Sequence, residues 1–363
     1  MKKILYIGKD VSRPKTGGEI CSYNNRKILK NIFLEKYNIY ALPDESKFQI
    51  LLNKFFFLYP GLQIKVIKDI YEKIKELGPT YIFLETAQYG ILAKKIKRKF
   101  PECKIISFFH NIEIEYAKSY FSLWRIKSWY FYFLTKLNET SSIEYSDYCF
   151  TINKKDAEKM LKIYKREADF IMPFSVENKI SDEESRKLNE NKERIHSKNC
   201  LFIGSNFFGN TDGLKWFIKN ILPNVDVHLT IVGNGMSKDF CDNEKITVFD
   251  FVKDLSCFYK KTDFVILPII SGGGMKTKTA DALMYGKSII GTPNAFSGYD
   301  IKNLKGVYEC ETKDDFIFAI KKIYDDDIFT FNQEIHERFV LRHSISVTEK
   351  STREFFLTLE SEE

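Results

Sequence analysis

The chain has 363 residues, of which 44% are hydrophobic and 29% charged, and its net charge is +7. This composition is typical of a soluble globular protein, and its modest, dispersed basic excess argues against a nucleic-acid-binding protein. Seven cysteines without a C-x-x-C pair favour reduced thiols over disulfides or zinc. The first apolar stretch ends at Lys9 and Asp10, too early for a signal peptide. We therefore expect a cytoplasmic protein without a membrane span.

Short apolar runs alternate with longer helical patterns along the first half of the sequence. Strands are expected at 4–8, 81–85 and 104–110, and helices at 20–33 and 90–100. The basic run at 94–99 is interpreted as the solvated face of a helix. Strands that alternate with helices predict a parallel sheet covered by crossover helices.

A polar stretch divides the chain, and the same rhythm then starts again. Strands are expected at 201–204, 228–233, 246–251, 264–268 and 288–292, and helices at 212–221 and 277–285. We predict an α/β protein with an N-terminal Rossmann-like domain (1–174), a polar linker (175–198), a second Rossmann-like domain (199–331) and a final helical segment (332–363) that packs back on the first domain. Two such domains predict a cleft, with ligands at the carboxyl ends of the strands.

The most informative segment runs from 267 to 287, where a strand ends and three glycines precede a helix. Glycines allow the backbone to approach a ligand, and the N–H groups of a helix start favour a phosphate. Lys276 and Lys278 lie at this helix start, where the helix dipole disfavours cations unless an anion is bound. Asp281 lies on the same helix, and ribose hydroxyls would serve a partly buried carboxylate there. An ordinary flexible loop with incidental lysines is the alternative.

This segment resembles the donor-binding segment of GT-B-fold glycosyltransferases of retaining family four, the group 1 glycosyl transferases. Asp281-Ala282-Leu283-Met284-Tyr285-Gly286-Lys287 occupies the place of the family's Glu-Ala-Leu-Ala-x-Gly-Lys run. Two departures are plain, since Asp281 replaces the second glutamate of the family's Glu-x7-Glu motif and Gly273 stands at the first. The resemblance extends over nearly the whole chain, through Leu201–Asn206, Ile231–Gly235 and the His110-Asn111-Ile112-Glu113 segment.

The resemblance implies a GT-B enzyme that transfers a sugar from a nucleotide-sugar donor to a glycan or lipid-linked acceptor in surface polysaccharide synthesis. It implies retention of anomeric configuration and no cofactor beyond the co-substrate. The catalytic candidates are His110, Lys278 and Asp281. The donor-binding candidates are Gly204, Asn206, Asn210, Gly233, Gly272, Gly273, Gly274, Met275, Lys276 and Thr277, and the acceptor or first-loop candidates are Gly17, Gly18, Asn111 and Glu113.

Charge stabilisation is expected from the two lysines and helix N–H groups rather than from a metal, because no Asp-x-Asp pair ends a strand. The run Asp325-Asp326-Asp327 is interpreted as solvated surface. A nucleotide-sugar epimerase would need acid and base residues that the sequence does not offer. A non-catalytic nucleotide-binding or scaffold protein of the same fold stays open, because both glutamates of the motif are replaced.

An aromatic and basic segment at 120–134, with a second apolar cluster at 55–59, suggests peripheral contact with a membrane. Core packing is the alternative.

Overall fold

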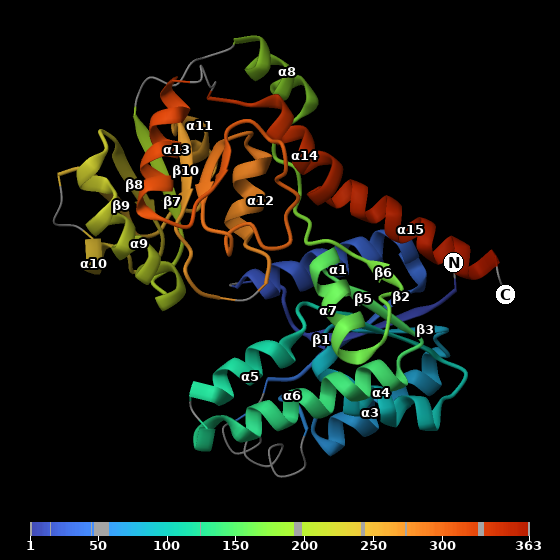
Figure 1. The fold of residues 1–363 in the computed structure, drawn as a ribbon. Helices are drawn as coiled ribbons and strands as arrows, with labels where there is room; N and C mark the ends of the chain where they lie inside the picture. The colour runs from blue at the N-terminus through green and yellow to red at the C-terminus, as the bar shows by residue number, and fades with distance from the viewer. Residues whose placement is uncertain are drawn as a thin grey trace. The chain divides into compact units, whose positions relative to one another are not determined.

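The computed structural model describes residues 2–14, 16–44, 46, 58–123, 125–191, 198–240, 244–272, 274–325 and 330–361. The side chains of 119–128, 191 and 238 are outside this description. The chain forms two compact units, Met1–Phe174 with Ile345–Glu363, and Ser175–Ser344 (Figure 1). Phe55, Phe56, Phe57, Gly273, Asp326 and Asp327, which entered the sequence predictions, lie outside the described residues.

The first unit is built on a six-stranded sheet in the order β2-β1-β3-β4-β5-β6, with every neighbouring pair parallel. Its strands are nearly continuous apolar runs, as expected for a parallel sheet that is covered on both faces. They are β1 (Ile4–Lys9), β2 (Tyr37–Leu42), β3 (Tyr81–Leu84), β4 (Lys104–Phe109), β5 (Tyr148–Thr151) and β6 (Phe170–Ile171).

The helices of the first unit cover this sheet and enclose its core. They are α1 (Gly17–Phe33), η1 (Leu34–Lys36), α3 (Ile64–Leu77), η2 (Ala87–Tyr89), α4 (Gly90–Lys99), α5 (Glu113–Leu123), α6 (Arg125–Tyr145), α7 (Lys154–Tyr164) and α15 (Ile345–Ser361). The C-terminal helix α15 packs on α1, where the Phe356 ring meets those of Phe33 and Tyr81.

The start of α1 corrects one expectation. Gly17 and Gly18 were predicted to lie in a loop, but they form the first turn of the helix. The Thr16 side chain accepts the N–H of Glu19, and the Glu19 side chain accepts the N–H of Thr16. This capping box satisfies N–H groups that a helix start leaves unpaired, so the helix begins earlier than its apolar pattern indicates.

The second unit repeats the design with the strand order β12-β11-β10-β7-β8-β9, again all parallel. Its strands are β7 (Asn199–Ile203), β8 (His228–Val232), β9 (Ile246–Phe249), β10 (Phe264–Leu267), β11 (Ser288–Gly291) and β12 (Val307–Glu309). Its helices are α8 (Asp182–Asn191), α9 (Phe208–Asn220), η3 (Leu222–Asn224), α10 (Ser237–Phe240), α11 (Ser256–Lys261), α12 (Thr277–Met284), α13 (Lys313–Asp325) and α14 (Gln333–His343).

Segments near the unit boundaries have more structure than the sequence suggested. Residues 175–198 were predicted as a linker, yet they include α8, whose buried Ser185 donates a hydrogen bond to Gln333 Oε1 at 2.8 Å. The final segment, 332–363, contains two helices, of which α14 belongs to the second unit and α15 to the first.

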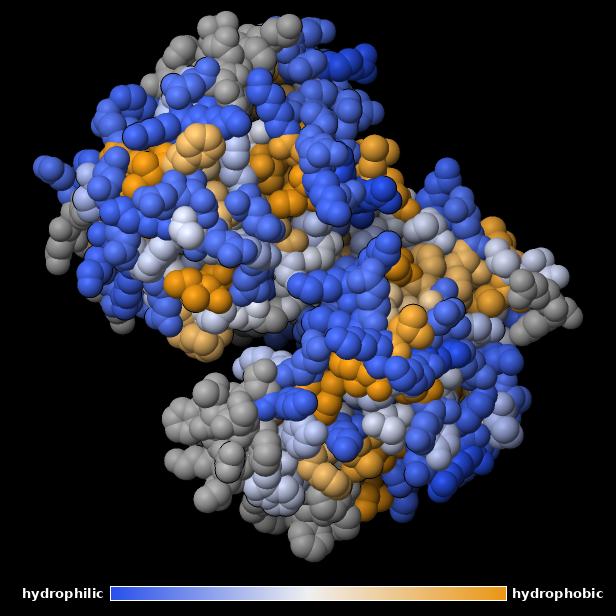
Figure 2. All heavy atoms as spheres, viewed as in Figure 1, coloured by the Kyte–Doolittle hydropathy of each residue, from blue (hydrophilic) through white to orange (hydrophobic). Residues whose placement is uncertain are grey.

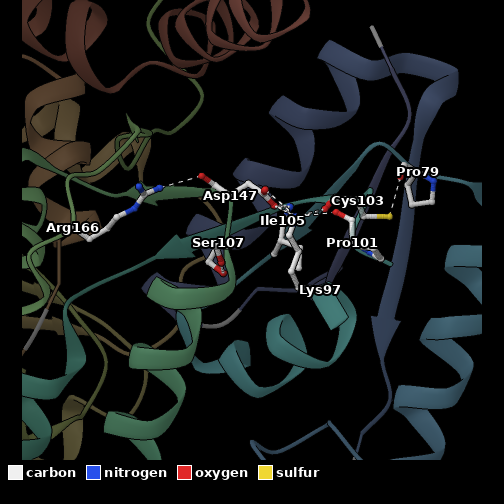
Figure 3. Close-up of polar contacts among 9 residues, drawn as sticks. Pro79, Lys97, Pro101, Cys103, Ile105, Ser107, Asp147 and Arg166 are labelled. Atoms are coloured by element: carbon white, nitrogen blue, oxygen red, sulfur yellow. Dashed lines mark hydrogen bonds and ion pairs between the residues drawn. The ribbon is translucent and has the colours of Figure 1, made fainter. Parts of the chain in front are cut away.

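Lys97 departs from the predicted solvated face of the basic run. Its Nζ donates to both carboxylate oxygens of Asp147 and to the Cys103 carbonyl, and Asp147 accepts the N–H of Ile105 (Figure 3). Lys95, Arg98 and Lys99 are exposed as expected. The partly buried Lys97–Asp147 pair therefore fixes the amino end of β4, and Lys97 does not belong to a solvated face of the helix.

The face shown in Figure 2 is mostly hydrophilic, with hydrophobic residues in separate patches. No helix among the described residues is long and apolar enough to cross a membrane. The six cysteines of the described part of the chain are all free thiols, and five of them are buried.

Candidate functional site

The second sheet has a point where the chain changes direction across it. The neighbours β7 and β10 lead to strands on opposite sides, so the loops that follow them diverge. In open parallel sheets, ligands bind outside the carboxyl ends of the strands at this switch point. Here the two loops are 204–207 and 268–276, and they carry many of the predicted donor-binding residues.

Lys278 links these loops. From α12 its Nζ donates to Asn210 Oδ1 at 2.7 Å, while Asn210 Nδ2 donates to the Ser205 carbonyl at 2.9 Å. The Nζ also lies 4.6 Å from the ring centroid of Phe202. A Cβ on Gly204 would lie 2.8 Å from this Nζ, so glycine leaves room for the lysine. The structure thus brings the donor-binding candidates Gly204 and Asn210 together with the catalytic candidate Lys278.

Lys276 holds the glycine turn. Its Nζ donates to the carbonyls of Gly272 at 3.0 Å and Gly274 at 2.7 Å. Gly272 and Gly274 have φ values of 113° and 69°, which only glycine adopts without strain. Tyr299, a residue that sequence reasoning missed, donates its hydroxyl to the Lys276 carbonyl at 2.7 Å. These bonds fix the backbone where α12 begins.

Both lysines are partly buried. Burial lowers the pKa of Lys276 to about 8, and burial with the nearby charge of Lys276 lowers that of Lys278 to about 7. Lys276 is the N-cap of α12 and supplies no side-chain cap, while its carbonyl accepts the N–H of Thr279 at 3.0 Å. The N–H groups of Thr277 and Lys278 are therefore the ones that a ligand can meet at this helix start. Thr277 opens the helix and Met275 precedes it, both partly exposed. This arrangement suits a phosphate group, which would restore charge to the lysines and satisfy the N–H groups.

Asp281 lies one turn beyond Lys278 on α12. Burial raises the pKa of its carboxyl to about 6, against the opposing charge of Lys179. Its carboxylate accepts no hydrogen bond from the described residues. A partly buried carboxylate without donors is costly, so hydroxyl groups of a ligand would stabilise it.

Asn206 and Gly233 have structural roles at the same carboxyl edge of the second sheet. Asn206 Nδ2 donates to the Gly235 carbonyl at 2.9 Å and to Asp239 Oδ2 at 3.2 Å. A Cβ on Gly233 would lie 1.7 Å from the Gly204 carbonyl oxygen. Both residues therefore hold the loops after β7 and β8 close together. The exposed rings of Phe207 and Phe208, 4.2 Å apart, were not predicted, although they directly follow Asn206.

In the first unit, His110 follows β4 and begins a short segment that leads into α5. Burial lowers the pKa of its imidazole to about 4, and the ring hydrogen-bonds the main chain of Glu85 and packs edge-on against Phe108 at 4.7 Å. A neutral imidazole with one nitrogen bonded keeps the other nitrogen for a ligand hydroxyl. Asn111 and Glu113 follow it, and burial raises the pKa of Glu113.

Sequence reasoning missed Glu85, which directly follows β3 beside the switch point of the first sheet. Its carboxylate pairs with Arg26 at 3.1 Å, and burial raises its pKa against hydrogen bonds from Ser22 and the Lys9 main chain. A Cβ on Gly8 would lie 1.7 Å from Glu85 Oε2, so glycine is required there. A carboxylate directly after a fully apolar strand was the available signal. Gly18, in contrast, has open space around it.

Comparison with known proteins supports the fold and matches part of the chain to a family. Residues 197–326 match the family described as glycosyl transferases group 1. A curated protein of the cps region of Klebsiella pneumoniae, described as uncharacterized, is 26% identical over 215 residues, and the chain spans about half the length of this relative.

Solved structures share the whole architecture at low sequence identity. The lipopolysaccharide outer core galactosyltransferase WaaB has 13% identity and a TM-score of 0.67, covering 98% of this chain and 99% of its own. HepE of Anabaena, solved with UDP and glucose, has 11% identity and a TM-score of 0.68 over 99% and 100% of the two chains. Sucrose-phosphate synthase from Thermosynechococcus elongatus reaches 0.71 at 11% identity and full coverage of both. The predicted GT-B fold is confirmed.

Proposed function

We propose that this chain, whose residues 197–326 match the glycosyl transferases group 1 family and which has a GT-B fold, is a glycosyltransferase that takes a sugar from a nucleotide-sugar donor and adds it to a surface-glycan acceptor. The observation that carries the proposal is the pair Lys276 and Lys278 beside the open start of α12 at the β7–β10 switch point. Such a site suits the diphosphate of the donor, and HepE, which shares the fold, was solved with UDP.

We propose that the two lysines and the first N–H groups of α12 stabilise the departing nucleoside diphosphate. As the bond from the sugar to the diphosphate breaks, negative charge grows on the phosphate oxygens, and fixed cations and N–H dipoles stabilise it. Asp281 accepts hydrogen bonds from hydroxyl groups of the ribose, and His110 forms a hydrogen bond with a hydroxyl group of the sugar. Retention of configuration, which the family resemblance implies, and independence of metal, which rests on the two lysines and the lack of an Asp-x-Asp pair at a strand end in the sequence, are part of the proposal. Activity that survives EDTA supports the second point, and activity that stops until Mg²⁺ is restored overturns it.

The acceptor and its location belong to the same proposal. The cps-region relative and WaaB favour a capsule or lipopolysaccharide glycan, free or lipid-linked. On α6, Trp129, Phe133 and Lys136 are exposed at i, i+4 and i+7, which suits peripheral contact with an anionic membrane. Co-sedimentation with phosphatidylglycerol vesicles but not phosphatidylcholine vesicles, weakened by Trp129→Ala with Phe133→Ala, is expected. Equal recovery with both vesicles contradicts the membrane contact.

The donor is tested by thermal shift against UDP, GDP, dTDP and their sugar conjugates. A ligand at 100 times its Kd adds about 2.7 kcal/mol of stability. A shift with one nucleotide, lost in Lys278→Ala, followed by release of that nucleotide on transfer, supports the enzyme. Binding without transfer or hydrolysis favours the non-catalytic scaffold instead, because Asp281 and Gly273 replace both glutamates of the motif. No shift with any nucleotide overturns both.

A further inference from the structure

Glu139 is a buried carboxylate in the interior of α6, with 0% of its surface exposed. Its Oε1 accepts the main-chain N–H of Glu113 at 2.6 Å, and its Oε2 accepts that of Ile114 at 3.2 Å. The hydroxyl of Tyr164, from α7, also donates to Oε2 at 2.6 Å. Burying a charged carboxylate costs free energy unless hydrogen bonds compensate, and three donors bond to this one.

The two N–H groups belong to the first turn of α5. A helix leaves its first N–H groups without intrahelical partners, and an anion near them also meets the positive end of the helix dipole. A residue next to the helix start usually supplies this cap. Here the cap comes from a different helix, α6, so the start of α5 is fixed to α6 and α7 rather than only to its own loop.

The capped turn directly follows the segment that carries His110. Only His110, Asn111 and Ile112 separate β4 from Glu113. The imidazole is fixed at the entry by the Phe108 ring and the Glu85 main chain. At the exit, Ile112 is buried in a cluster that includes Met160. A segment of three residues leaves little slack, so a displaced α5 start would move the His110 ring.

We propose that Glu139 is a positioning residue that holds the His110 segment in place by capping α5 from α6. The inference rests on the proposed function only in giving His110 a part in sugar transfer. Glu139 itself contacts no reacting group, and its effect passes through the main chain of Glu113 and Ile114 to the preceding loop.

The protonation of Glu139 should produce a measurable, pH-dependent change at His110. The pKa of its carboxyl is raised to about 7, chiefly by burial and also by the Glu113 charge, against the Tyr164 hydroxyl and the two N–H groups, which lower it. Both forms are therefore populated near neutral pH, and the charged form accepts the stronger hydrogen bonds. The neighbouring elements also bear other titratable or charged groups, namely Tyr132 on α6, the Lys159–Glu115 pair joining α7 to α5, Asp156 on α7, Lys94 on α4 and Tyr89 on η2.

The test is NMR of the full chain labelled with ¹³C-histidine, in which His110 is identified by the signal lost in His110→Gln. His110 itself titrates at about 4, so a step in its signal near pH 7 reports a neighbour. We expect that step in the wild type and its loss in Glu139→Gln, which keeps the volume but not the charge. Tyr164→Phe should move the midpoint upward, because the hydroxyl lowers the pKa of Glu139.

Glu144→Gln is the matched control, since Glu144 is exposed on the same helix and should leave the step unchanged. A step that persists in Glu139→Gln overturns the inference, as does a wild-type signal that stays flat near pH 7. If Glu139→Gln fails to fold, an unmoved midpoint in Tyr164→Phe overturns it equally. The readout needs no substrate, so a failed sugar transfer would not affect it. With transfer established, Glu139→Gln should lower kcat by up to about 100-fold and leave nucleotide affinity unchanged.

Discussion

Replacing Lys278 by methionine removes the ammonium group and keeps most of the side-chain volume. The Nζ is held 2.7 Å from Asn210 Oδ1, over the ring of Phe202, in surroundings that lower its pKa to about 7. A hydrogen bond to a charged group contributes about 1.5–3 kcal/mol. Since about 1.4 kcal/mol corresponds to a factor of ten, Lys278→Met should weaken nucleoside diphosphate binding roughly 10- to 150-fold.

The lowered pKa also predicts proton uptake on binding. At pH 7 roughly half of the Lys278 side chains are neutral, because the pKa is about 7. A bound diphosphate favours the charged form and raises this pKa. Binding at pH 7 should therefore take up roughly half a proton at Lys278, and affinity should fall as pH rises above 7. Lys276, with a pKa of about 8, adds only roughly a tenth of a proton.

Isothermal titration with UDP in PIPES and in Tris measures this uptake, because the two buffers differ in their heats of ionisation. Lys278→Met should lose most of the uptake together with the affinity. Lys219→Met, at an exposed position of α9, is the control and should change neither. Equal proton uptake by Lys278→Met and the wild type would refute the assignment of a half-neutral lysine at the phosphate site, even if the affinity fell.

Three further predictions concern other residues. Gly213→Ala places a Cβ 1.6 Å from the Pro268 carbonyl oxygen, so thermal denaturation should show a loss of about 1–3 kcal/mol, whereas Gly18→Ala, which meets nothing within 4 Å, should show none. His110→Ala should slow transfer and leave UDP affinity unchanged, and His110 should contribute no step to the wild-type rate profile at its ordinary pKa of 6.5 because burial keeps it neutral there. Asp281 has its pKa raised from 3.8 to about 6, so the ligand-free protein loses stability as pH rises across that window. Asp281→Asn should therefore raise Tm above pH 6 while weakening nucleotide-sugar binding, and a lower Tm would contradict this.

The fold was accessible from the sequence because parallel strands buried on both faces read as short apolar runs. β10 and β11, for example, are buried along their whole length. The helix starts were less accessible, because apolar periodicity does not decide them. The Thr16–Glu19 capping box places the start of α1 at Gly17. Helix α9 begins at Phe208 rather than at Asp212, and no side chain caps that start.

The residues of the candidate site also fall into those that the sequence predicted and those that it did not. Lys276, Lys278 and the glycines lie within one continuous segment, so their spacing along the chain predicted a phosphate site. Glu85, Glu139 and Tyr299 act through partners far away in sequence, such as Arg26 for Glu85 and the start of α5 for Glu139. Residue types alone contain no signal for such pairings, because the fold has to bring the partners together first.

The electrostatic character of the two switch points, each taken within its own unit, differs. At the second sheet, two partly buried lysines with lowered pKa values lie at a helix start without a side-chain cap and donate to neutral carbonyl and amide oxygens. At the first sheet, the cation Arg26 is already paired with Glu85, and the nearby His110 is neutral. A diphosphate is therefore favoured at the second sheet. The first sheet, with its satisfied ion pair and neutral imidazole, suits uncharged hydroxyl groups, which need directed hydrogen bonds rather than net charge.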